Sequence, residues 1–194
     1  MFPLPIYTPF VLFLFDSLSR LWNNSIIERL GLMSVAYLDI ETTGISCDSS
    51  SITVIGIYLV RGTRRQMFQL VGKEVTPESL LEILDGVETI YTYNGSRFDL
   101  PFIEGALGID LTELCEHHDL MYDCWRCNLR GGFKAVERYL GIPRETVGIT
   151  GWDAVILWHR YIRRNDRKAL ATLLHYNKED TMNLKLLKER LSEF

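Results

Sequence analysis

A short apolar run that ends in acidic residues constrains the fold of this 194-residue chain more than any other feature. Residues 35–40 (Val-Ala-Tyr-Leu-Asp-Ile) have the pattern of a buried strand, and Glu41 follows directly. Side chains two apart on a strand point to the same face, so Asp39 and Glu41 place two carboxylates side by side. Such like charges repel unless a cation lies between them. The pair is a candidate metal site, and the simpler alternative is that Glu41 begins a solvent-exposed loop.

The rest of the chain predicts an α/β domain. Residues 52–60 and 66–71 have strand patterns, and the short 61–64 turn between them predicts an antiparallel hairpin. A fourth strand is expected at 87–93. Helices are expected at 76–84, 99–107, 132–140, 152–164 and 166–191. Three strands, a helix, a strand and then helices predict a mixed sheet flanked by helices, within one domain at 34–194.

Composition and charge exclude several classes of protein. Hydrophobic residues make up 47% of the chain and charged residues 24%, which excludes wholesale disorder. The net charge of −4 argues against a protein that coats nucleic acid by bulk positive charge. An enzyme that gathers carboxylates around metal ions and contacts a polyanion locally remains compatible with it. Four cysteines are too few for a disulfide scaffold, so we expect a reducing, cytoplasmic setting.

Residues 1–33 form an extension outside the predicted domain. Residues 4–15 are apolar, but Pro5 and Pro9 interrupt them and the run is shorter than the about 20 residues of a spanning helix. No basic residue precedes Arg20, whereas a secretory signal carries basic residues before its apolar core. We therefore expect no membrane association. The extension is either a packed N-terminal helix or sequence upstream of a start at Met33.

Two further acidic clusters follow along the chain. Residues 93–102 (Tyr-Asn-Gly-Ser-Arg-Phe-Asp-Leu-Pro-Phe) end a strand and place Asp99 near a helix start, where a capping role is the plainer alternative. Residues 175–180 (His-Tyr-Asn-Lys-Glu-Asp) fall on the last predicted helix, where Tyr176 and Asp180 are four apart and share one face. A buried tyrosine beside an acid is also a routine structural pair. Each cluster is ambiguous alone, and only their combination is specific.

In this order the clusters resemble the three exonuclease motifs of the DEDD superfamily of 3′–5′ exonucleases. The matching strings are Asp39-Ile40-Glu41-Thr42-Thr43-Gly44, Asn94-x3-Phe98-Asp99 and Tyr176-x3-Asp180. More narrowly, residues from about 34 to 191 resemble the YprB-type ribonuclease H-like domains. That resemblance rests on Asn94-Gly95-x2-Phe98-Asp99-x-Pro101-Phe102, Gly132-Phe133-Lys134-x2-Glu137-x2-Leu140-Gly141-Ile142 and Tyr176-Asn177-x-Glu179-Asp180-x2-Asn183-Leu184. It implies a ribonuclease H-like α/β fold with a mixed five-stranded sheet flanked by helices.

The resemblance also implies roles for individual residues. The metal-binding carboxylates would be Asp39, Glu41, Asp99 and Asp180. Carboxylate oxygens favour Mg²⁺ or Mn²⁺, and two such ions can activate a water and stabilise the leaving oxyanion of a phosphodiester. Tyr176 would be the fifth catalytic residue and would position the attacking water or help to deprotonate it. The residues expected to contact the terminal nucleotide of a single-stranded 3′ end are Thr42, Asn94 and Phe98.

His175 is an alternative to Tyr176, because it lies five residues before Asp180 and so fits the histidine form of the third motif. On a regular helix Tyr176 lies about 40° from Asp180 around the axis, and His175 lies about 140° away. Helical geometry therefore favours Tyr176, provided that the helix has already begun at this point. A histidine in a loop before the helix would still reach the site.

The leading hypothesis is a metal-dependent 3′–5′ exonuclease that acts on nucleic acid, with nothing in the sequence that distinguishes DNA from RNA. The alternatives are a non-catalytic nucleic-acid-binding module with the same fold and an endonuclease of ribonuclease H type. The presence of all four acids favours catalysis, since a degenerate module would be expected to lose one.

Two other groups of residues have a possible function. The cysteines Cys115, Cys124 and Cys127, together with His117 and His118, resemble a partial zinc site, but ordinary packing or substrate lining is the favoured interpretation. The only dense basic stretch is residues 160–168. It is a candidate for phosphate contacts, and the alternative is a solvated helix face with Trp158, Tyr161 and Ile162 in the core.

Overall fold

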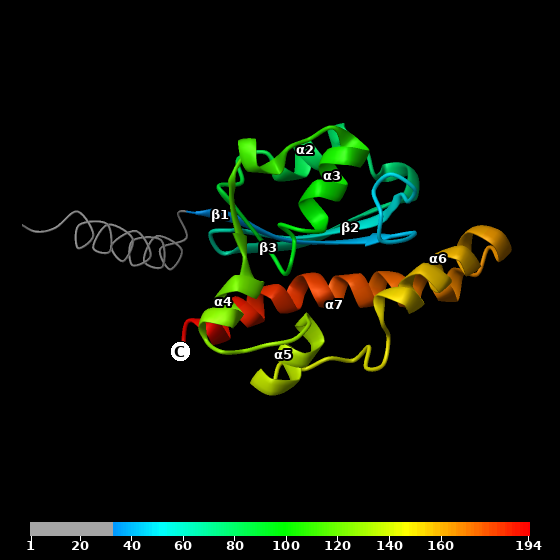
Figure 1. The fold of residues 1–194 in the computed structure, drawn as a ribbon. Helices are drawn as coiled ribbons and strands as arrows, with labels where there is room; N and C mark the ends of the chain where they lie inside the picture. Colours follow the sequence, from blue (N-terminus) through cyan, green and yellow to red (C-terminus); the bar gives the residue numbers. More distant parts are fainter. Residues whose placement is uncertain (1–32) are drawn as a thin grey trace, which may run out of the picture.

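Five strands form one mixed sheet at the centre of the fold (Figure 1). Their order is β3-β2-β1-β4-β5, with antiparallel β1–β2 and β2–β3 pairs and parallel β1–β4 and β4–β5 pairs. Their bounds are β1 (Ser34–Thr42), β2 (Ile52–Arg61), β3 (Arg64–Val71), β4 (Thr89–Thr92) and β5 (Glu116–Asp119). The predicted hairpin and the mixed five-stranded sheet are confirmed. This computed structural model describes residues 33–194, so the predicted extension lies outside the described residues except for Met33.

Helices cover both faces of the sheet. They are α2 (Pro77–Leu84), α3 (Asp99–Leu107), α4 (Leu120–Arg126), α5 (Phe133–Leu140), α6 (Gly151–Arg164) and α7 (Arg167–Leu191), and short 3-10 turns occupy Gly72–Glu74 and Leu111–Glu113. The side chain of Thr76 caps α2 by accepting a hydrogen bond from the Ser79 amide, with Pro77 at the first helical position. Within residues 33–194, no helix combines the length and the apolar character that crossing a bilayer requires.

Sequence pattern did not locate β5 and α4. The β5 sequence Glu-His-His-Asp has no apolar alternation, because the strand lies at the edge of the sheet and pairs only with β4. The α4 helix is seven residues long, too short for a periodic pattern to emerge. These two elements matter for the site because Asp119, at their junction, caps α4 through the Met121 amide.

Alternation along β1 decides which way its acids point. Ala36, Leu38 and Ile40 belong to the core beneath α2 and α3. Val35 and Tyr37 belong to the opposite core, against α7. Figure 1 shows α2 and α3 on one side of the sheet and α7 running along the other. Asp39 and Glu41 continue the second series, so they face the helix that carries the third acidic cluster.

The α7 helix approaches the sheet closely at Gly56. A Cβ atom at this position would lie 2.3 Å from Thr181 Oγ1 and 2.4 Å from Asn177 Oδ1, distances that real Cβ atoms do not show. Gly56 is also the partner of Asp39 in the β1–β2 register. The missing side chain therefore lets α7 pack closely on β2, directly beside Asp39 on the neighbouring strand β1.

Candidate active site

Three carboxylates from two elements converge between the sheet and α7. Asp39 and Glu41 extend from β1 and Asp180 from α7, and one ligand atom of each lies within 4.8 Å of the other two. Glu41 and Asp180 are both only 7% exposed. Glu41 is part of β1 itself, so the alternative that it begins a solvent-exposed loop is wrong. An all-oxygen donor set of this kind suits a hard divalent cation.

Asp99 lies beside this cluster with a different orientation. It is the first residue of α3 and is 5% exposed. Its Oδ1 accepts a hydrogen bond of 3.1 Å from the Ile40 amide, which fixes the carboxylate against β1. Among the described residues the three-carboxylate cluster does not include Asp99. The structure therefore gathers three of the four predicted ligands and holds the fourth at the backbone between Asp39 and Glu41.

The acids raise one another's pKa values. Burial raises the pKa of Asp39 and of Glu41 well above the ordinary range, and repulsion from Asp180 adds to both shifts. Burial also raises the pKa of Asp180, although the nearby Arg144 and Lys134 oppose that shift. For Asp99, burial raises the pKa to about 7, against the lowering effect of the Ile40 amide. The raised pKa values mean that the ionised carboxylates are unfavourable in the metal-free site. A divalent cation bound between them would stabilise their ionised form.

Asp99→Asn is expected to stabilise the metal-free protein at about pH 8 and to have little effect at about pH 4. The raised pKa means that the folded state holds the Asp99 proton more tightly than the unfolded state does. Its contribution to stability is therefore present at low pH and is lost as the pH rises toward 7. Asparagine keeps the acceptor for the Ile40 amide and carries no charge. Melting temperatures in chelator at both pH values test this, and a gain of equal size at both would contradict it.

The third motif places tyrosine, and not histidine, beside the acids. Because α7 begins at Arg167, both candidates lie on a regular helix. Tyr176 is 4% exposed and lines a pocket of about 290 Å³ together with Asp39 and Asp180. His175 is half-exposed, with Nε2 3.2 Å from a carboxylate oxygen of Glu145 outside this pocket. Burial, reinforced by the nearby acids, raises the pKa of Tyr176, so its hydroxyl stays protonated at neutral pH.

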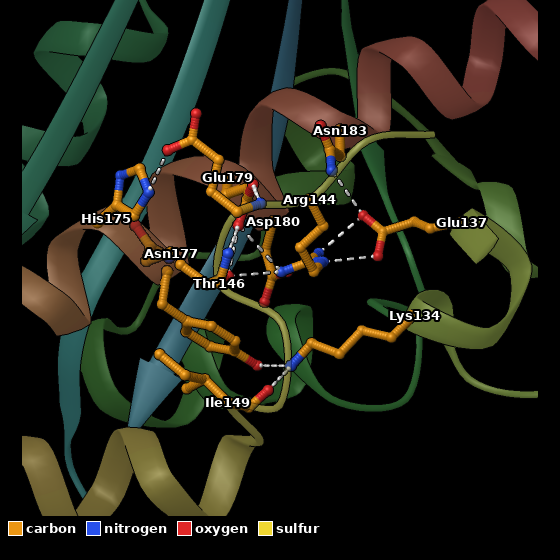
Figure 2. Close-up of polar contacts among 12 residues, drawn as sticks. Lys134, Glu137, Arg144, Thr146, Ile149, His175, Asn177, Glu179, Asp180 and Asn183 are labelled. Atoms are coloured by element: carbon orange, nitrogen blue, oxygen red, sulfur yellow. Dashed lines mark hydrogen bonds and ion pairs between the residues drawn. The ribbon is translucent and has the colours of Figure 1, made fainter. Parts of the chain in front are cut away.

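Lys134 is a site residue for which the sequence indicated no role. Its Nζ donates a hydrogen bond to the Tyr176 hydroxyl at 2.5 Å and another to the Ile149 carbonyl at 2.6 Å (Figure 2). The same nitrogen lies 4.1 Å from the centroid of the Tyr176 ring. Burial lowers the pKa of Lys134, and Asp180 and Glu41 offset part of that shift. Lys134 therefore fixes the tyrosine hydroxyl and carries positive charge into the pocket.

Arg144 connects Asp180 to a buried polar network (Figure 2). Its guanidinium donates to both oxygens of Glu137, at 2.8 and 2.7 Å, and to Asp180 Oδ1. Glu179 lies 3.7 Å from the same guanidinium, and Asn183 donates to Glu137 at 2.7 Å. Glu137 is 1% exposed. The network thus holds one oxygen of the Asp180 carboxylate in a fixed place.

Asn177 performs the corresponding task for Asp39. Its Nδ2 donates to Asp39 Oδ2 at 3.1 Å and to the Asp39 carbonyl at 3.3 Å. Its Oδ1 accepts a hydrogen bond of 2.9 Å from Gln69 on β3. Asn177 is fully buried, so these contacts tie α7 to the strand beside the acids.

The predicted nucleotide-contacting residues lie outside the lining of this pocket. The Thr42 hydroxyl donates a hydrogen bond to the Gly44 carbonyl, and the backbone N–H of Asn94 donates one to the Asp119 carboxylate. Phe98 packs against Phe102, with ring centroids 5.4 Å apart. Besides Asp39, Lys134, Tyr176 and Asp180, the pocket is lined by Tyr93, Gly132, Phe133 and Ala135. The string Gly132-Phe133-Lys134, quoted above without a role, was therefore the sequence signal for this wall.

The cysteine–histidine group and the basic stretch have structural partners. Within the described range, no three of the cysteine and histidine side chains are close enough to hold an ion, and Cys124 is packed in the core beside α7. On α6, Arg160 pairs with Asp166 at 2.7 Å, and Trp158 packs into the core with its ring near that of Tyr161. Phosphate binding by the basic stretch stays a prediction.

A mixed five-stranded sheet with acids on β1 facing acids on the last helix defines a ribonuclease H-like domain. The chain matches the RNase_H superfamily over residues 36–192 and belongs to that superfamily. No curated protein sequence matches it.

Two solved structures share this fold, and a third is similar at a lower TM-score. A family B DNA polymerase from the hyperthermophilic archaeon Pyrobaculum calidifontis is similar, with a TM-score of 0.64 and 18% identity over 82% of this chain and 24% of that chain. A nuclease solved in its apo form has a TM-score of 0.54 and 17% identity over 88% of this chain and 75% of that chain. Brucella melitensis NrnC with bound Mg²⁺ has a TM-score of 0.45 and 15% identity over 84% and 86%. The chain thus spans about a quarter of the polymerase and three quarters of the nuclease.

Proposed function

We propose that this protein is a metal-dependent 3′–5′ exonuclease of the YprB type, which hydrolyses DNA or RNA at single-stranded 3′ ends. The observation that carries the proposal is the convergence of Asp39, Glu41 and Asp180, with ligand atoms within 4.8 Å of one another. The fold shared with a solved nuclease is consistent with it. We take residues 34–194 as the catalytic domain.

The residues fit a divalent metal centre. Asp39, Glu41, Asp99 and Asp180 would hold two Mg²⁺ or Mn²⁺ ions, because carboxylate oxygens are the preferred ligands of both. Within residues 33–194, two cationic side chains lie near these acids: Arg144 binds Glu137 and one oxygen of Asp180, and Lys134 binds the Tyr176 hydroxyl. Bound ions would supply an activated water and stabilise the leaving oxyanion of the phosphodiester.

The remaining site residues orient the reacting groups. Because Lys134 donates to the Tyr176 oxygen, the tyrosine hydrogen is directed away from Lys134 and toward Asp180, where it would donate to a water or a phosphate oxygen bound beside that acid. Burial and the neighbouring acids raise the pKa of Tyr176, so the metal-free protein keeps that hydrogen, and Tyr176 would orient the attacking water by donating to it. Asn177 orients Asp39, and Arg144 orients Asp180.

Tyr176→Phe is expected to lower the rate of hydrolysis by roughly 10²- to 10⁴-fold, the range for the loss of one acid–base or positioning group. The change removes a hydroxyl and little volume, so the melting temperature should stay near that of the wild type. His175→Ala is the matched control, and we expect it to be nearly silent because that side chain is half-exposed beside Glu145. The reverse pattern, with an inactive His175→Ala variant, would assign the role to histidine.

Time courses with end-labelled single-stranded DNA and RNA test the proposed activity. A ladder of products shortened from the 3′ end by single nucleotides, formed with Mg²⁺ or Mn²⁺ and abolished by chelator, is the expected result. Internal cuts would indicate an endonuclease. Binding without metal-dependent products would indicate a non-catalytic module and would overturn the proposal.

A further inference from the structure

Two arginines and two aromatic side chains form a cluster next to the candidate active site, called here the arginine–aromatic cluster. Arg97 precedes α3, Tyr122 and Trp125 lie on α4, and Arg130 follows α4. The Arg97 guanidinium carbon lies 6.0 Å from the Tyr122 ring centroid and 5.7 Å from that of Trp125. The Arg130 guanidinium carbon lies 5.4 Å from the Trp125 centroid. Trp125 therefore holds both guanidiniums in place through cation–π contacts.

The charges of these two arginines are not neutralised within the described part of the chain. Arg97 and Arg130 are exposed, and neither makes an ion pair with a carboxylate of residues 33–194. Arg126, on the same helix as Trp125, is instead paired with Asp123. A guanidinium in contact with an aromatic ring keeps N–H donors available for an anion. The cluster is thus a fixed patch of positive charge on a chain whose net charge is −4.

Two chain segments connect the cluster to the pocket. Tyr93 lines the pocket four residues before Arg97, and Phe133 lines it three residues after Arg130. The segments are joined by a 2.7 Å hydrogen bond from the Tyr93 hydroxyl to the Gly131 carbonyl, and the Tyr93 and Phe133 ring centroids are 5.0 Å apart. Four residues span at most about 14 Å. That distance corresponds to about four stacked nucleotides at roughly 3.4 Å each.

We propose that the arginine–aromatic cluster binds backbone phosphates of the single-stranded substrate, a few nucleotides from the 3′ end in the pocket. This inference rests on the proposed function and adds the path of the strand to it. Arginine N–H groups bind phosphate oxygens in fixed geometry, and contacts of this kind carry no base preference. Trp125 positions the two arginines, and Arg97 and Arg130 make the contacts.

Binding and cleavage by Arg97→Gln, Arg130→Gln and the double variant test the inference. For a single strand of about 12 nucleotides in chelator, we expect weaker binding at low salt and a shallower dependence of log Kd on log salt, by about 0.7 for each arginine removed. The KM of a cleavable strand of that length should rise, while kcat/KM for a dinucleotide should stay at the wild-type value. Arg65→Gln on β3 is the matched control, because this arginine is exposed and β3 lies at the sheet edge opposite to β5, the strand that leads into α4.

The outcomes separate this inference from the proposed function. Unchanged binding and salt dependence in the double variant, or an equal loss in Arg65→Gln, would overturn the inference while leaving wild-type cleavage standing. Displacement of the strand by polyglutamate as effectively as by unlabelled DNA would assign the cluster to an acidic peptide and also overturn it. Wild-type binding that weakens as expected in the variants, without any cleavage, would support the subsite and contradict the exonuclease proposal.

Discussion

Asp39→Asn is expected to abolish metal-dependent cleavage and to leave the fold intact. Asp39 contributes one of three ligand atoms that lie within 4.8 Å of one another, so its neutralisation removes a ligand and part of the charge that would attract a cation. Burial and three neighbouring acids raise its pKa, which means that its ionised form is unfavourable in the metal-free fold. We therefore expect the melting temperature in chelator to stay level or rise. The same substitution at Asp180 should also abolish cleavage.

A matched control for the loss of charge is Asp48→Asn, which neutralises an exposed aspartate in the loop after β1. Cleavage by this variant should proceed at the wild-type rate with the same requirement for Mg²⁺ or Mn²⁺. A wild-type rate in Asp39→Asn would contradict the carboxylate site. A loss of activity accompanied by a large fall in melting temperature would show that Asp39 supports the fold and not the chemistry.

Arg144→Met is expected to lower the free energy of unfolding by about 3–5 kcal/mol, the usual effect of removing one partner of a buried ion pair. The Arg144 side chain is 8% exposed and binds both oxygens of Glu137, whose side chain is 2% exposed. Methionine fills much of the volume but leaves the Glu137 carboxylate buried, with Asn183 as its remaining partner among residues 33–194. Urea denaturation at neutral pH measures the change.

Arg160→Met provides the comparison on the surface. Arg160 pairs with Asp166 at a similar distance of 2.7 Å, but its side chain is 51% exposed. Exposed pairs contribute about 0–1 kcal/mol, so this variant should unfold close to the wild-type midpoint. Equal, small effects of the two substitutions would contradict the stabilising role of the buried Glu137–Arg144 ion pair.

Most of the fold was predictable because its elements are long and periodic. The β1, β2 and β3 strands and α7 are each eight residues or longer, and each carries an apolar or alternating pattern over at least six residues. The β5 strand was not predictable, since its four polar residues become a strand only by pairing with β4. Its position is set by long-range contacts that no local pattern encodes.

The acids of the site were predictable, and their partners were not. Carboxylates at a strand end and on a helix face have a recognisable spacing. The contacts of Lys134 with Tyr176, Arg144 with Asp180 and Asn177 with Asp39 join residues 42, 36 and 138 positions apart. These residues come together only when α7 packs against the sheet, and the absence of a side chain at Gly56 permits that packing. The turn of Asp99 toward the Ile40 amide also depends on this assembled geometry.

Binding of Mn²⁺ to the metal-free protein, followed by isothermal titration calorimetry at neutral pH, tests the central claim most directly. We expect saturable binding to the wild type and to Asp48→Asn, and its loss in Asp39→Asn and Asp180→Asn. Melting temperatures of the same samples verify that each variant is folded. No saturable binding by the folded wild type, or binding of equal strength in Asp39→Asn, would contradict a metal centre built on β1 and α7.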